Sequence, residues 1–198
     1  MILHNYYNKM IIGILGRKGA GKDTIADHMI KNYKFQKLVL AQPLKDACKV
    51  LFNFNDEQLY GNLKETIDPN WGVSPRQVLQ YVGTDIFRKD ITRIIPDINS
   101  NFWVNLMSTK YKQMKENDPN IRVVVSDVRF ENEINEIHKL NGIIIKVTRP
   151  GMSNNDMHDS ERLIDNLHGD YEIQNDSGIE ELYNKINNIL DENVFKKS

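Results

Sequence analysis

A glycine-rich segment near the start of the chain carries the residue types that bind a polyphosphate. The string IIGILGRKGAGKDT runs from a β-branched stretch through three glycines into Lys22, Asp23 and Thr24. Glycine lets backbone N–H groups curl round an anion without obstruction from a Cβ, and a following helix N-terminus adds a favourable dipole. A lysine here reaches the β- and γ-phosphates of a nucleoside triphosphate. We therefore predict an ATP-binding loop made by Gly16, Gly19, Ala20, Gly21, Lys22, Asp23 and Thr24.

The loop departs from the usual phosphate-loop pattern at one position, where Asp23 replaces the expected Ser or Thr and Thr24 follows one place later. This leaves open whether the Thr24 hydroxyl or a water held by Asp23 meets Mg²⁺. A glycine-rich turn that only joins a strand to a helix is the plain alternative. A guanine-nucleotide switch would carry an Asn-Lys-x-Asp string, which this sequence does not contain. Phosphoryl transfer to a small acceptor is favoured.

An acid-arginine pair follows a second apolar stretch, in the string RVVVSDVRFENE. It places Asp127 at the end of a predicted strand, Arg129 two residues later and Glu133 on the first turn of the next helix. Strand ends in open α/β sheets are where ligands bind. The carboxylate could hold Mg²⁺, directly or through water, or orient the acceptor, and the guanidinium could clamp a phosphate. An ion pair at the sheet edge is the plain alternative.

A third candidate is a helix that starts at a capping box, with Ser74 as N-cap, Pro75 at the first helical position and Gln77 at N3. Leu79, Val82 and Ile86 form an apolar side that we expect to pack inward. On another face, helical spacing gathers a cation, an amide, bare backbone and a hydroxyl, which could read a base and a phosphate. These four residues are Arg76, Gln80, Gly83 and Thr84.

An acceptor monophosphate carries roughly −1.5 to −2 charges near neutral pH, so its approach to ATP requires several cations and a metal ion. Arg149 opens a polar loop, GMSNNDMHDSER, that could close over ATP, and we assign Arg149 to the nucleotide. Trp103 could stack on a base or pack in the core. The candidate cations are Lys18, Lys22, Lys45, Arg76, Arg88, Arg129, Arg149 and Arg162.

Elements of alternating type must position these residues. Short β-branched runs predict strands at 10–15, 37–40, 122–126, 143–148 and 171–174. Helical periodicity predicts helices at 24–33, 43–52, 75–87, 102–115, 131–140 and 179–190. The pattern is typical of an α/β fold, with a mostly parallel sheet of about five strands covered by helices on both faces.

Composition argues against several classes of partner and site. Balanced charge, with 26 basic and 27 acidic residues, argues against a nucleic-acid partner, and the apolar runs fall short of a membrane span. The single cysteine, Cys48, excludes an intrachain disulfide and is expected to be a core or half-buried residue. Scattered histidines give no zinc site. We expect one intracellular domain over 1–198, with a core at about 10–52 and 121–192, an acceptor-binding helical region at about 53–118 and a lid at about 149–168.

The motifs GRKGAGKDT, AQPLKDA, SPRQVLQYVGTD, SDVRFENE, VTRPGMSNNDMH and IQNDSGIEEL, in this order, resemble the deoxynucleoside monophosphate kinases of large DNA phages and viruses. The resemblance spans nearly the whole chain. It implies a P-loop kinase fold, ATP with Mg²⁺, a deoxynucleoside monophosphate (dNMP) acceptor, a homodimer, and the cytoplasm of the host or producing cell.

Site roles carry over by position. The glycine loop matches the ATP site, with Lys22 catalytic, and Arg149, Asn175 and Asp176 resemble the region that flanks adenine. Asp127 and Arg129 are the other catalytic candidates. For the metal, Thr24 is the expected ligand and Asp127 could assist through a water, while a water held by Asp23 stays the alternative. The acceptor site matches Lys18, Lys45, Arg76, Gln80, Gly83, Thr84, Arg88, Trp103, Asp127, Arg129 and Glu133.

The sequence leaves two alternative functions open. Animal-type phosphomevalonate kinase has a similar GKD loop and Asp-x-Arg strand end, but its acceptor has no base for Trp103 and Gln80 to read. An ATP-gated module acting on nucleic acid is a reading from another class, and the sequence shows no basic stripe to support it. The span 53–74 is shorter than in the phage form, so base preference stays open.

Overall fold

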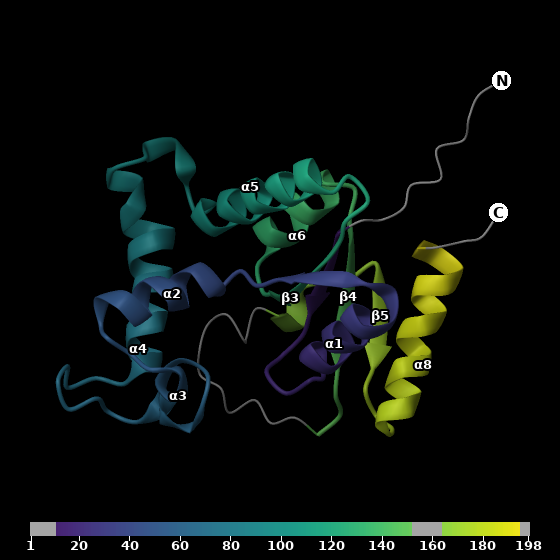
Figure 1. Cartoon of the computed structure of the whole chain (residues 1–198), viewed down its shortest axis with the longest axis horizontal. Coiled ribbons are helices and arrows are strands. Elements are labelled where there is room, and N and C mark those ends of the chain that lie inside the picture. Colours follow the sequence, from purple (N-terminus) through teal and green to yellow (C-terminus); the bar gives the residue numbers. More distant parts are fainter. Residues whose placement is uncertain (1–10, 152–163, 195–198) are drawn as a thin grey trace. The chain divides into compact units, whose positions relative to one another are not determined.

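The computed structural model describes residues 11–151 and 164–194 (Figure 1). Its contacts divide the chain into two compact units. The first, here the sheet unit, contains the residues up to Val39 and those from Ser108 onward, and the second, the helical unit, is Leu40–Met107. Among the described residues no helix is long and apolar enough to cross a membrane.

The sheet unit is built on five parallel strands in the order β2-β3-β1-β4-β5, which confirms the predicted sheet. β1 lies at the centre, where Ile12 pairs with Val124 of β3 on one side and with Ile143 of β4 on the other. All five residues of β1 are buried, as expected for a strand covered on both faces. The strands are β1 Ile11–Leu15, β2 Phe35–Leu38, β3 Arg122–Val128, β4 Ile143–Thr148 and β5 Tyr171–Gln174.

β2 begins two residues earlier than the predicted strand at 37–40. The preceding helix α1 (Lys22–Tyr33) is followed by its C-cap Lys34, whose backbone is left-handed with φ 58°, so the chain is already extended at Phe35. Phe35 and Leu38 are the buried residues of β2, and Phe35 pairs with Arg122 of β3. Burial of Phe35 in the core therefore sets the start of β2, whereas the sequence pattern predicted a strand without this residue.

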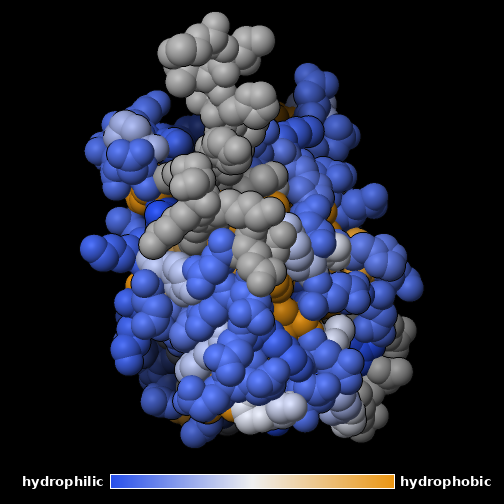
Figure 2. Space-filling view, turned by 90° about the vertical axis from the view of Figure 1, so that its right-hand side faces the viewer, coloured by the Kyte–Doolittle hydropathy of each residue, from blue (hydrophilic) through white to orange (hydrophobic). Residues whose placement is uncertain are grey.

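Helices cover both faces of the sheet (Figure 1). α1 and α8 (Ile179–Ile189) pack on one face, where Met29 and Ile186 join a buried cluster with β1 and β4 residues such as Ile12 and Ile145. α6 (Glu131–Lys139) lies on the other face, and its Ile137 comes within reach of Gly13 in β1. The short turn η5 (Ile164–Asn166) precedes β5, and η6 (Leu190–Val194) follows α8. The face shown in Figure 2 is mostly hydrophilic.

The helical unit consists of short helices round a small core of its own. Cys48 lies in this core and is fully buried, which confirms its expected place, and burial raises the pKa of its thiol. The elements are α2 Gln42–Leu51, α3 Asp56–Leu59, η1 Asn62–Glu65, α4 Pro75–Gln80, η2 Tyr81–Lys89, η3 Asp90–Arg93, η4 Pro96–Ile98 and the first residues of α5 Phe102–Asn117. α2, which we had placed in the sheet core, belongs to this unit.

The predicted capping box is confirmed at α4, where the Ser74 hydroxyl accepts the Gln77 N–H at 3.3 Å and the Gln77 amide oxygen accepts the Ser74 N–H at 2.8 Å. The prediction that Ile86 packs inward is wrong, since Ile86 is 36% exposed. From Tyr81 the helix is a π-helix, whose bonds run from i to i+5. The inward position after Val82 is therefore Phe87, which packs against the core.

Candidate active site

The phosphate loop joins β1 to α1 at the carboxyl edge of the sheet. Gly19 and Gly21 have φ angles of 83° and 110°, which L side chains rarely adopt. A Cβ on Gly16 would lie 2.4 Å from the Val147 carbonyl oxygen, and one on Gly21 would lie 2.7 Å from the Asn175 amide nitrogen. Glycine is therefore required at these positions, because a side chain would strain the backbone angle or clash with a neighbouring atom.

Lys22 begins α1 and is only 8% exposed. Its ammonium group donates a hydrogen bond to the Arg17 carbonyl at 2.8 Å, inside the curve of the loop. The Arg17 carbonyl also accepts the Ala20 N–H at 3.1 Å. A buried ammonium at the mouth of an amide-lined loop is a site for an anion.

The two residues after Lys22 differ in their surroundings. Asp23 is exposed, and its carboxylate accepts a hydrogen bond from the Lys37 ammonium of β2 at 2.8 Å. Thr24 is half-buried in the first turn of α1. Asp23 is thus already engaged by a lysine, and the assignment of Thr24 as a metal ligand stays a prediction.

Asp127 and Arg129 lie at the same edge as the loop, because Leu15 at the end of β1 pairs with Val128. The structure therefore brings together the two motifs on which the sequence interpretation depends. Glu133 is 1% exposed, and its carboxylate accepts the N–H groups of Arg129 and Phe130 at 2.8 and 3.2 Å. Glu133 thus fixes the backbone at Arg129, and its contact with an acceptor stays a prediction.

The carboxyl ends of β4 and β5 complete this edge. Asn175 donates from its side-chain amide to the Ala20 carbonyl at 2.9 Å, and its N–H donates to the Thr148 carbonyl at 2.7 Å. Asp176 accepts a hydrogen bond from Lys185 at 2.9 Å, and this bond lowers the pKa of the carboxyl group. Asn175, predicted only from the family resemblance, lies directly against the phosphate loop.

Arg149 follows β4 and lines a pocket of about 230 Å³ beside the phosphate loop. Three charged residues that line it were not predicted as site residues: Arg17, Lys146 and Asp165. One signal could have pointed to Lys146, which is a lone charge in the apolar strand IIIKVT. Arg162 and the loop 152–163, predicted as part of the lid, lie outside the described residues.

The predicted acceptor residues fall mostly in the helical unit. Lys45 lies over the ring of Tyr60, 4.1 Å from its centroid, and Arg76 forms an ion pair with Glu65 at 3.1 Å. Gln80, Thr84 and Arg88 are half-buried on α4 and η2, and Lys18 is exposed on the phosphate loop of the sheet unit.

Gly83 and Trp103 have structural contacts within the helical unit. A Cβ on Gly83 would lie 2.7 Å from Cδ2 of Leu44, so α2 makes the close approach that this glycine suggested. Trp103 is 7% exposed, and its indole N–H donates to the Gly83 carbonyl at 2.9 Å. Its ring also packs against Phe87 and Phe102. Packing therefore accounts for Trp103, and stacking on a base stays a prediction.

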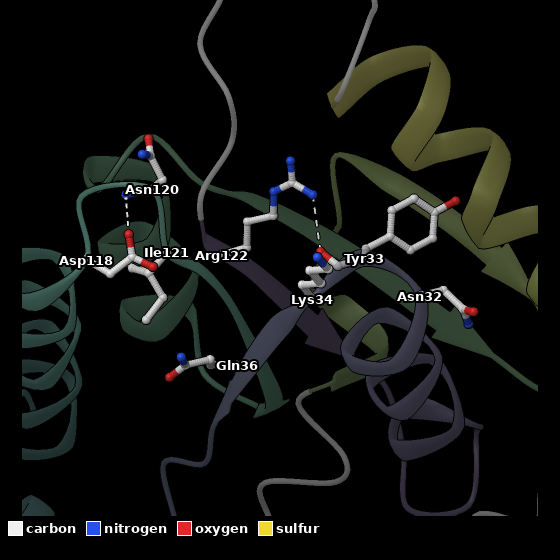
Figure 3. A pocket seen from close by; sticks show the side chains of 8 residues that line it. All are labelled: Asn32, Tyr33, Lys34, Gln36, Asp118, Asn120, Ile121 and Arg122. Carbon is white, nitrogen blue, oxygen red and sulfur yellow. Dashed lines mark hydrogen bonds between the residues drawn. The ribbon is translucent and has the colours of Figure 1, made fainter.

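A larger pocket of about 500 Å³ lies at the amino ends of β2 and β3, away from the phosphate loop (Figure 3). Arg122 crosses it and donates to the Tyr33 carbonyl at 3.1 Å. None of the predicted site residues lines it.

Comparison with known proteins gives the family of the chain. A family model described as deoxynucleotide monophosphate kinase matches residues 9–67 and 57–186. A protein of Acanthamoeba polyphaga mimivirus, named provisionally as such a kinase, is 40% identical over 92% of this chain and 96% of its own length. The deoxynucleotide monophosphate kinase of Enterobacteria phage T4 is 26% identical over 91% of this chain and 98% of its own.

Solved structures support the fold alone. Shikimate kinase from Aquifex aeolicus superimposes with a TM-score of 0.51 at 14% identity, over 95% of this chain and all of its own. A Thermus thermophilus protein gives the same TM-score at 16% identity, over 94% of this chain and 99% of its own. Because the family model matches most of the chain and the mimivirus protein is 40% identical over 92% of it, this chain belongs to the deoxynucleotide monophosphate kinase family.

Proposed function

We propose that this chain transfers the γ-phosphoryl group of ATP to a deoxynucleoside monophosphate, giving the diphosphate and ADP. The observation that carries the proposal is the register of β1 and β3, in which Leu15 pairs with Val128. It puts the phosphate loop next to Asp127 and Arg129, so one edge of the sheet offers an anion cradle, a carboxylate and a guanidinium. Phosphoryl transfer needs these groups because its catalysis is positioning and charge stabilisation.

On the donor side, Lys22 would exchange the Arg17 carbonyl for β- and γ-phosphate oxygens, and the loop N–H groups would bind the remaining oxygens. Asn175 would keep the loop in place, while Arg149 and Asp176 would flank the adenine.

Mg²⁺ in kinases is held by one or two protein oxygens together with substrate phosphates. The donor set here fits that pattern, since Thr24 lies half-buried in the first turn of α1 and Asp127 lies near the end of the neighbouring strand β3. The Thr24 hydroxyl would bind Mg²⁺, with Asp127 acting through a water. The bound ion would neutralise charge on the β- and γ-phosphates.

On the acceptor side, Arg129 would clamp the dNMP phosphate, and Asp127 would orient it. Lys18 would add positive charge where the two phosphates meet. The helical unit would supply the base and sugar contacts, for which we propose Lys45, Arg76, Gln80, Gly83, Thr84, Arg88 and Trp103. Glu133 would contribute by holding the Arg129 backbone, through its 2.8 Å bond to that N–H.

We place the enzyme as a homodimer in the cytoplasm of the cell that makes it, without nucleic acid as a partner. Exposed apolar side chains in the helical unit suit a contact between copies, since Val50 is 82% exposed, Leu51 68% and Ile67 65%. Val50→Asp with Leu51→Lys should then give a monomer in analytical ultracentrifugation. A wild-type chain that sediments as a monomer would remove this part of the proposal.

The substrate test measures ADP release with Mg-ATP and a panel of dNMPs, ribonucleoside monophosphates and phosphomevalonate. We expect the highest kcat/KM with one or more dNMPs. Highest activity on phosphomevalonate would instead favour the animal-type phosphomevalonate kinase reaction, and a steep salt dependence of DNA binding would revive a nucleic-acid role.

A further inference from the structure

We infer that Asp165 is a positioning residue for the phosphate loop, which it holds through the guanidinium of Arg17. The inference rests on the proposed function, because it concerns how the ATP site is ordered. Arg17 donates from Nε to one carboxylate oxygen of Asp165 at 2.9 Å and from Nη2 to the other. Two parallel bonds of this kind fix the plane of a guanidinium as well as its distance.

Arg17 also supplies the acceptor that holds the key ammonium group. Its carbonyl oxygen accepts hydrogen bonds from Nζ of Lys22 at 2.8 Å and from the Ala20 N–H at 3.1 Å. The side chain of Arg17 is therefore tied to Asp165 while its backbone closes the loop on Lys22. A loop that is ordered before ATP arrives loses less conformational freedom on binding, so the tie should strengthen ATP affinity.

The other end of the tie is anchored independently. Lys146 on β4 is 8% exposed, and its ammonium group donates to the carbonyls of Asp165 and Leu167 at 3.1 and 2.6 Å. Ile164, the first residue of the same turn, is 1% exposed. Lys146 is in turn fixed by the sheet, where it pairs with Leu15. The carboxylate of Asp165 thus reaches Arg17 from a turn that is bound to the strand beside the loop.

A positioning role for Asp165 and a purely electrostatic role predict opposite effects of Asp165→Asn on ATP affinity. If only charge mattered, Asp165→Asn would remove a negative group near the triphosphate and tighten ATP binding, while Arg17→Gln would weaken it. If Asp165 positions the loop through Arg17, both changes weaken ATP binding. The side chains are 21% and 56% exposed, so the pair should contribute little to folding itself.

The experiment measures Mg-ATP affinity by calorimetry, and KM and kcat with the best dNMP, for the full chain and for Arg17→Gln, Asp165→Asn and the double variant. We expect each single change to raise Kd and KM for ATP by about three- to tenfold with a much smaller change in kcat. The double variant should be no worse than the poorer single variant, because one interaction is lost in all three. Asp165→Glu, which keeps a carboxylate, should recover most of the affinity.

Tighter or unchanged ATP binding by Asp165→Asn would overturn the inference, as would single effects that multiply in the double variant. Should Arg17→Gln fail to fold, Arg17→Lys keeps the charge without the two parallel bonds and should still weaken ATP binding. Lys139→Gln is the matched control for a lost cation, since Lys139 pairs with Glu136 on α6 at 3.7 Å and should leave ATP affinity unchanged.

The two proposals fail in different ways. A wild-type chain that binds Mg-ATP but phosphorylates no dNMP contradicts the proposed acceptor, while the affinities of the variants still decide the role of Asp165. An active wild type whose variants bind ATP normally contradicts the role of Asp165 alone.

Discussion

The two units of this chain differ in how well the positions of their candidate site residues can be predicted from the sequence. In the sheet unit, backbone geometry constrains the loop that connects β1 to α1. Gly19 and Gly21 have left-handed φ angles, and Gly16 lies too close to the Val147 carbonyl oxygen for a side chain to fit. In the helical unit, the site residues lie along a helix that changes from α to π at Tyr81. Local motifs determine where the site residues lie in the sheet unit, whereas helix register and packing determine where they lie in the helical unit.

The difference shows that a motif is more informative when its residues are constrained by backbone geometry than when they share a helix face. Spacing placed Asp127 and Arg129 next to the loop, as the strand register confirms. The same kind of spacing placed Ile86 in the core, and the π-helix put Phe87 there instead. A helix face can be predicted only when the hydrogen-bond register is known.

The largest effect should come from the phosphate loop. Lys22→Ala removes an ammonium that is buried at the loop mouth and is expected to bind the transferring phosphoryl group. We expect kcat/KM to fall by about a thousandfold, or on the order of 4 kcal/mol of transition-state stabilisation. Steady-state ADP release checks this. Lys139→Ala on α6 is the control, and a Lys22→Ala enzyme of near-normal activity would contradict the role of the loop.

Arg129→Ala should follow, with kcat/KM for the dNMP lower by about a hundredfold, because a guanidinium that clamps the acceptor phosphate contributes on the order of 3 kcal/mol. The KM for ATP should change much less, which separates the acceptor role from the donor role. Initial-rate kinetics with each substrate varied in turn provides the measurement. Normal turnover by this variant would show that the end of β3 has another role.

In the helical unit, Gly83→Ala should destabilise the fold by about 1 to 2 kcal/mol, because the new methyl group would meet Leu44 at 2.7 Å. The double variant with Leu44→Ala relieves that contact, and we expect it to lose less stability than the sum of the two single changes. Urea unfolding of the three variants tests the prediction. Strict additivity would mean that α2 and η2 do not press on each other at this glycine.

Trp103→Phe separates the hydrogen bond of the indole from ring stacking, which a phenyl group can still provide. It removes the 2.9 Å hydrogen bond to the Gly83 carbonyl but keeps an aromatic ring. Stability should fall by about 1 kcal/mol, because a buried carbonyl loses its partner. The KM for the dNMP should stay close to that of wild type. A large rise in that KM at unchanged stability would show that the indole reads the base.

The smallest effect concerns Asp176, whose pKa is lowered from 3.8 mainly by its hydrogen bond to Lys185. A carboxyl group with a depressed folded-state pKa stabilises the fold above its unfolded pKa, and this contribution is lost as the pH falls through the folded value. Lys185→Gln should therefore lower stability slightly at neutral pH and narrow its difference from wild type in acid. Thermal melts at neutral and acidic pH should show this convergence, and a constant gap would contradict it.

The sequence by itself determined the presence of the five strands, the phosphate loop and the Asp127–Arg129 strand end, because strand periodicity, glycine spacing and the rules of parallel sheets act locally or through simple topology. Only the tertiary structure decided that Asn175 braces the loop, that Glu133 holds the Arg129 backbone, and that Asp165, itself held by Lys146, binds Arg17. Asn175, Lys146 and Asp165 are more than 100 residues from the loop in sequence, and no local pattern records a contact formed by neighbouring strands.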